Sequence, residues 1–77
     1  MKTIKILGTG CPKCKTAETN VRKAIEETGI EANVVKVQEI DQIMAYHILS
    51  TPAIVIDEVV KIKGRVPDVS EIKSLLN

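Results

Sequence analysis

Two cysteines stand close together in this 77-residue chain, Cys11 and Cys14, within the string GCPKC at residues 10–14. A disulfide across so short a loop adds only about 2 kcal/mol through the entropy of the unfolded chain, which is a weak reason for a structural bridge. Structural zinc takes four ligands, and the sequence adds only one distant histidine, His47, so a zinc site would have to be shared between two chains. A redox dithiol needs two neighbouring thiols, one of them acidic, and this spacing fits that chemistry as well.

Four short segments have the composition of β-strands. Residues 2–7 and 32–37 are rich in β-branched side chains, and residues 53–56 are wholly apolar. Residues 59–63 are more polar, which predicts an edge strand. Glycines at positions 8 and 10 end the first segment, and Asp57-Glu58 predicts a turn between the last two.

Three helices are expected between and after these strands. The first begins at the cysteines, with Pro12 in its first turn, and ends at Gly29. Its apolar or small face comprises Cys14, Ala17, Val21, Ala24, Ile25 and Thr28. A short second helix would place Ile40, Ile43, Met44 and His47 on one face. A capping box of Asp68 and Glu71 predicts the start of a last helix, whose apolar residues are Ile72, Leu75 and Leu76.

The order of elements is therefore βαβαββα. A βαβ unit implies a parallel pair of strands with a right-handed crossover, and the terminal ββα implies an antiparallel hairpin backed by a helix. We expect an α/β fold of three layers, α/β/α, around a four-stranded mixed sheet, built as a single domain from residues 1–77.

The order places Cys11 where the first strand gives way to the first helix. Free N–H groups and the positive end of the helix dipole favour an anion there, and Lys13 and Lys15 add positive charge. We therefore expect a pKa for Cys11 below that of a free thiol, whereas Cys14 falls on the buried face and should stay protonated longer. In this interpretation Cys11 attacks a substrate disulfide, and Cys14 then attacks the sulfur of Cys11 to release the reduced substrate.

The overall composition argues against several other classes of protein. A formal net charge of +1 gives no long-range field for nucleic acid or an anionic membrane. Tyr46 is the only aromatic residue, too few for stacking on single-stranded bases. No apolar run approaches the roughly 20 residues of a membrane span, and the first residues lack the pattern of a signal peptide. The expected compartment is therefore the cytoplasm.

Several motifs together resemble the thioredoxin-fold proteins. These are the Gly-Cys-Pro-x-Cys that joins a strand to a helix, Thr51-Pro52 before an apolar strand, and Gly64 after the last strand. The chain is most similar to the small archaeal and bacterial thioredoxin-like proteins known as redox-active disulfide proteins. Their further signatures are matched here by Gly-Thr-Gly-Cys at residues 8–11, Asp-Gln-Ile at residues 41–43 and Ile-Lys-Gly-Arg-Val at residues 62–66.

This resemblance implies roles for individual residues. Cys11 would be the nucleophile and Cys14 the resolving cysteine, with Pro12 and Lys13 between them tuning the reduction potential. The Thr51-Pro52 bond would be cis, and the backbone of Thr51 would face the cysteines and pair with a substrate peptide. Pro52 and Gly64 would complete the substrate-binding loops.

Our leading hypothesis is a thiol–disulfide oxidoreductase that exchanges with disulfides of proteins or small molecules. It would work as a monomer without an organic cofactor or a metal, and would receive electrons from an upstream reductase of the thioredoxin-reductase kind. Two alternatives remain open at this point. The dithiol could belong to a small domain that binds or transfers Cu(I) or Zn, or to a binding module whose affinity depends on the redox state.

Overall fold

The computed structural model describes residues 2–76. Its elements, in chain order, are β1 (Lys2–Leu7), α1 (Pro12–Thr28), β2 (Ala32–Val37), α2 (Ile40–Met44), β3 (Ala53–Ile56), β4 (Val59–Lys63) and α3 (Val69–Leu76). This is the predicted βαβαββα order, with strand and helix bounds at the predicted residues in nearly every case.

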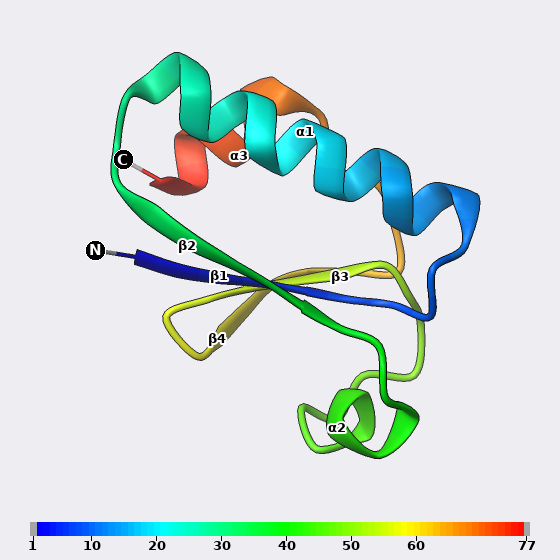
Figure 1. Cartoon of the computed structure of the whole chain (residues 1–77). Helices are drawn as coiled ribbons and strands as arrows, with labels where there is room; N and C mark the ends of the chain where they lie inside the picture. The colour runs from blue at the N-terminus through cyan, green and yellow to red at the C-terminus, as the bar shows by residue number, and fades with distance from the viewer. Residues whose placement is uncertain (1, 77) are drawn as a thin grey trace.

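Within residues 2–76 the four strands form one mixed sheet in the order β2-β1-β3-β4. Strand β1 runs parallel to β2 and antiparallel to β3, and β3 pairs antiparallel with β4. Helices α1 and α3 lie on one face of this sheet and α2 lies on the other (Figure 1). The expected three-layer α/β fold is therefore confirmed, with β4 at one edge of the sheet.

The core consists of two apolar clusters, one on each face of the sheet. Successive residues of a strand point to opposite faces, so Ile4 and Ile6 pack toward α1 and α3 while Leu7 packs toward α2. Strand β3 is buried along its whole length because it lies between β1 and β4 and is covered on both faces. Ile4 and Ile6 share their cluster with Ala17 and Val21 of α1, so the helix that follows the cysteines packs against β1.

Both ends of α1 have the predicted chemistry. Pro12 occupies the first helical position, where its missing N–H leaves no donor unsatisfied. At the other end Gly29 adopts φ 71°, and its N–H bonds to the carbonyl of Ile25. The helix starts directly behind Cys11, which is its N-cap residue.

The start of α3 follows only half of the predicted capping box. The N–H of Glu71 donates to Oδ1 of Asp68 over 2.8 Å, as an N-cap requires. The carboxylate of Glu71, however, forms a bidentate ion pair with the guanidinium of Arg65 instead of returning to the backbone. An arginine fork matches a carboxylate in two bonds, which explains this preference.

The prediction for α2 was partly wrong. Of the four residues expected to share one face of this helix, Ile43 is buried, while Ile40 and Met44 are 64% and 55% exposed. The helix ends at Met44, and His47 lies in the following turn at φ 60°. Five residues make less than two helical turns, so the short helix cannot present a continuous stripe to the sheet.

A polar cluster on the face of the sheet that α2 covers joins three segments of the chain. Lys5 of β1 donates to the hydroxyl of Tyr46 over 2.7 Å and forms an ion pair with Glu58 at 2.5 Å. The Tyr46 hydroxyl in turn donates to Glu58 over 3.2 Å, and the ammonium of Lys5 lies 5.4 Å from the centre of the Tyr46 ring. Glu58 stands at φ 67° in the turn between β3 and β4. The cluster ties the segment after α2 to the hairpin.

Candidate active site

Cys11 and Cys14 occupy the first turn of α1, where the strand β1 and the helix meet. Both cysteines are free thiols in this structure. Cys11 is half-buried and Cys14 is only 6% exposed, so an incoming substrate reaches Cys11 first. The backbone N–H of Cys14 donates to Sγ of Cys11 over 3.3 Å, and the thiol therefore serves as the side-chain cap of the helix.

The two thiols differ in acidity. The pKa of Cys11 is lowered, first by the hydrogen bond from the Cys14 thiol and then by the backbone N–H of Cys14, against an opposing effect of burial. The pKa of Cys14 is raised, first by burial and then by its own hydrogen bond to Cys11. The expected directions are confirmed, and the backbone N–H groups at the start of the helix contribute as expected. The largest cause at Cys11 is the Cys14 thiol, which was not foreseen, and no lysine side chain is among the causes.

Gly8 is a site residue that the sequence reasoning missed. A Cβ atom at Gly8 would lie 2.3 Å from Sγ of Cys14 and 3.1 Å from its Cβ, far inside contact distance. The Cys14 thiol therefore packs directly against the backbone at the end of β1. The sequence signal is a glycine that closes β1 just before the cysteines, and on its own it indicates only the end of a strand.

The structure brings Thr51 to the same place. The Thr51-Pro52 bond is cis, as the family resemblance implies. Cβ of Thr51 and Sγ of Cys14 both lie within 4 Å of the point where a Gly8 Cβ would stand. Thr51 is half-buried, and no backbone hydrogen bond within residues 2–76 engages its N–H or C=O. Thr51 therefore lies near Cys14, and among the described residues its two backbone groups have no backbone partner.

Gly64 is hydrogen-bonded to the loop that contains Thr51 and Pro52. Its N–H donates to the carbonyl of Pro52 over 3.0 Å, and its φ of 78° is one that glycine adopts without cost. A Cβ there would also come within 3.1 Å of Cβ of Ser50. Pro12 and Lys13, the residues between the cysteines, are both exposed on the first turn of α1.

An apolar groove begins beside this site. It has a volume of about 210 Å³ and is lined by Thr9, Ile40, Ile43, Met44, Ile48, Leu49 and Thr51. Leu49 is 92% exposed, and together with Ile40 and Met44 it gives the groove a wall of unburied apolar side chains. Such a surface suits an apolar segment of a protein better than a small polar molecule.

Comparison with known proteins decides the family. Residues 2–77 match the family described as the thioredoxin domain. The chain belongs to the thioredoxin family. A thioredoxin of Methanocaldococcus jannaschii is 45% identical over 76 residues, which cover 99% of this chain and 87% of that protein. A thioredoxin of Methanothermobacter thermautotrophicus is 42% identical over 77 residues and is matched along its full length.

Solved structures agree on the thioredoxin fold. A structure of thioredoxin-2, described as a component of malaria parasite protein secretion machinery, superposes with a TM-score of 0.76 at 14% identity and covers 99% of this chain and 81% of that one. A second malarial protein gives a TM-score of 0.75 at 14% identity and covers 99% and 93%. As a thioredoxin-family member the chain is, in general terms, a thiol–disulfide oxidoreductase, and the family suggests protein substrates and a reductase partner.

Two features of other protein classes are absent from the described residues. Within residues 2–76 no helix combines the length and apolarity that crossing a membrane requires. Over the same residues no three side chains of His, Cys, Asp or Glu are grouped so as to hold a metal ion.

Proposed function

We propose that this protein reduces disulfides of other proteins through a mixed disulfide on Cys11 that Cys14 resolves. The observation that carries the proposal is the contrast between the two thiols. Cys11 is half-buried with a lowered pKa, whereas Cys14 is buried with a raised pKa. A thiolate is the nucleophile in disulfide exchange, so the accessible and more acidic Cys11 attacks first.

The exchange then proceeds in two steps. The Cys11 thiolate attacks one sulfur of the substrate disulfide, and the other sulfur leaves as a thiolate with the bonding electron pair. Cys14 loses its proton and attacks Sγ of Cys11, which expels the second substrate sulfur as a thiolate. The substrate has gained two electrons and the protein carries a Cys11–Cys14 disulfide, which a reductase of the thioredoxin-reductase kind reduces again. No organic cofactor takes part.

The surrounding loops would position the substrate. Within residues 2–76 no backbone hydrogen bond engages the N–H or C=O of Thr51, which lies near Cys14, and these groups suit pairing with an extended substrate peptide. Pro52 and Gly64 hold this loop in place through their backbone hydrogen bond. The apolar groove, continuous with Thr51, would take apolar side chains that flank the substrate cysteine, while Pro12 and Lys13 tune the reduction potential.

The test is to trap the intermediate. Cys14→Ser removes the resolving thiol but leaves Cys11, so incubation with a protein that contains a disulfide should accumulate a covalent complex that mass spectrometry detects on Cys11. Cys11→Ser is the matched control and should form no such complex. The proposal fails if Cys14→Ser forms adducts no faster than free cysteine does.

A redox titration of the unaltered protein complements this test. The chain has no Trp to report the redox state by fluorescence, so thiols should be alkylated in dithiothreitol buffers and counted by mass. A clean two-electron transition supports the dithiol mechanism. Failure to form the Cys11–Cys14 disulfide contradicts it.

A further inference from the structure

A hollow borders the Thr51-Pro52 loop on the side where β4 ends. Its volume is about 440 Å³, and it is lined by His47, Leu49, Ser50, Lys63 and Gly64. Ser50 directly precedes Thr51, and the N–H of Gly64 donates to the carbonyl of Pro52 over 3.0 Å. The hollow, which we call the Lys63 hollow, therefore adjoins the backbone that would pair with a substrate.

The order of the strands places the Lys63 hollow and the apolar groove on opposite sides of one segment. Strand β3 lies between β1 and β4 and runs antiparallel to both, so the residues that lead into β3 have the ends of β1 and β4 as neighbours. The groove includes Thr9, just after β1, whereas the hollow includes Lys63, the last residue of β4. Leu49 lines both and is 92% exposed, so it forms a ridge between them.

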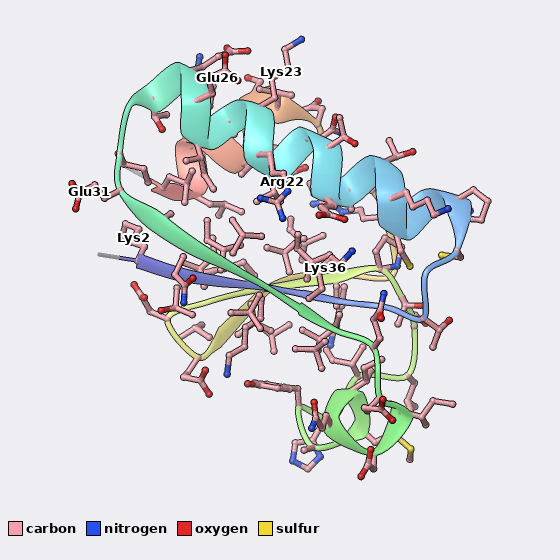
Figure 2. All side chains as sticks on the ribbon, in the orientation of Figure 1. Lys2, Arg22, Lys23, Glu26, Glu31 and Lys36 are labelled. Atoms are coloured by element: carbon pink, nitrogen blue, oxygen red, sulfur yellow. The ribbon has the colours of Figure 1, made fainter. Side chains whose placement is uncertain are left out.

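Lys63 gives this hollow a positive charge that no described residue neutralises. It is exposed, and among residues 2–76 no carboxylate oxygen lies within 4.0 Å of its ammonium group. Two nearby cations differ in this respect. Arg65 forms an ion pair with a glutamate of α3, and Lys36, in the space between α1 and β2 (Figure 2), lies 3.6 Å from a glutamate oxygen of α1. None of the described side chains that line the hollow is acidic, and His47 and Ser50 add an imidazole and a hydroxyl that can donate hydrogen bonds.

We propose that the Lys63 hollow binds an acidic side chain of a protein substrate, close in sequence to the cysteine that Cys11 attacks. A substrate segment that pairs with Thr51 is extended, and its successive side chains point to opposite sides. One side chain can thus lie toward the apolar groove while its neighbour lies toward the hollow, where a carboxylate meets the ammonium of Lys63. The preferred substrate therefore combines an apolar and an acidic residue beside its reactive cysteine. This inference rests on the proposed function and specifies its substrate class.

Synthetic peptides with one intramolecular disulfide test the inference. Each peptide carries Asp, Asn or Lys at a single position, which is moved through the three residues on either side of one cysteine. Fully reduced protein is mixed with each peptide, the reaction is stopped with acid, and the reduced peptide is counted by mass. Each rate is divided by the rate with dithiothreitol, which corrects for the effect of the charge on the disulfide itself.

The unaltered protein should prefer the acidic peptides. At one or more of these positions it should reduce the Asp peptide about threefold faster than the Asn peptide, as expected for an exposed ion pair, and the Lys peptide most slowly. Added salt should weaken this preference. Equal rates for Asp, Asn and Lys at every position overturn the inference.

Two charge reversals on β4 locate the effect. Lys63→Glu should invert the preference, so that the Lys peptide becomes the fastest. Lys61→Glu makes the same change at an exposed lysine of β4 that does not line the hollow, and it is the matched control that should keep the original preference. A preference that Lys63→Glu keeps, or one that both variants invert, also overturns the inference, because the hollow then has no part in it. If no peptide is reduced and Cys14→Ser traps none of them, the mixed-disulfide mechanism itself fails, and this inference fails with it.

Discussion

The backbone N–H of Cys14 donates a hydrogen bond to the sulfur of Cys11, and the thiol that meets the substrate is therefore also the cap of helix α1. A thiolate accepts this bond more strongly than a thiol does, because the charge-assisted bond also benefits from the helix dipole. Ionisation of Cys11 and the stability of the first turn of α1 are thus coupled. Formation of a disulfide neutralises the sulfur and weakens the same cap.

This relationship predicts how the acidity of Cys11 responds to changes at Cys14. Cys14→Ala removes the thiol donor that contributes most to the lowered pKa of Cys11, so that pKa should rise toward its usual value. Cys14→Ser keeps an O–H donor at the same position and should raise the pKa of Cys11 less than Cys14→Ala does. The pH dependence of Cys11 alkylation by iodoacetamide, followed by mass, measures both variants. Identical profiles for the two would contradict the assignment of the hydrogen bond.

Local signals along the chain were sufficient to predict most of the fold. Pro12 and Gly29 marked the two ends of α1, and the apolar run at residues 53–56 marked the central strand. Each of these features acts through its own backbone or its immediate neighbours. The cysteine pair at the start of a helix was for the same reason visible in the sequence, and with it the direction of the acidity difference.

Features that depend on packing between distant segments were not visible. The contact of Gly8 with the Cys14 thiol exists only because α1 folds back onto the end of β1. The ion pair of Glu18 with Lys36 joins α1 to β2 and has no local signature. The extent of α2 was mispredicted because apolar spacing does not reveal that the helix ends at Met44, which leaves His47 in the following turn.

Gly8 provides a second prediction. Gly8→Ala places a methyl group 2.3 Å from Sγ of Cys14, so the thiol or the helix must move. Overpacking of this kind costs about 1–3 kcal/mol, and the displaced thiol should also form the Cys11–Cys14 disulfide less readily. Urea unfolding and the dithiothreitol titration measure the two effects.

Gly29→Ala is the matched control for this change. Gly29 has φ 71°, but within residues 2–76 no atom beyond its own neighbours lies within 4 Å of the place its new methyl group would take, so alanine there strains the backbone without touching the site. We expect a loss of about 1–2 kcal/mol with an unaltered redox titration. An unchanged titration in Gly8→Ala would show that the contact with Cys14 has no influence on the dithiol.

The cluster of Lys5, Tyr46 and Glu58 provides a third prediction, for the pH dependence of stability. The hydrogen bond from Lys5 lowers the pKa of Glu58 below its ordinary value of 4.5. A carboxylate with a lowered pKa in the folded state stabilises the fold above its unfolded pKa, and this contribution disappears as the pH falls through the folded value. Glu58→Gln should therefore be less stable than the unaltered protein at neutral pH, and the difference should shrink in acid.

Urea unfolding at a series of pH values measures this difference directly. Glu26→Gln serves as a control for the loss of an exposed carboxylate and should not show the same dependence. A difference between Glu58→Gln and the unaltered protein that stays constant from neutral pH into acid would mean that the ion pair with Lys5 does not contribute.

The apolar groove beside Thr51 provides the last prediction, which distinguishes protein substrates from small ones. Leu49 is 92% exposed, so Leu49→Ser should leave the stability almost unchanged. If substrate segments lie in the groove, the variant should raise KM for a protein disulfide several-fold while the reaction with a small aromatic disulfide keeps its rate. Val59→Ser, at a 53% exposed apolar residue in β4 that does not line the groove, is the matched control and should change neither reaction. If Leu49→Ser lost activity equally on both substrates, the substitution would be acting on the cysteine pair and not on substrate binding. If it lost activity on neither, the groove would not contact the substrate.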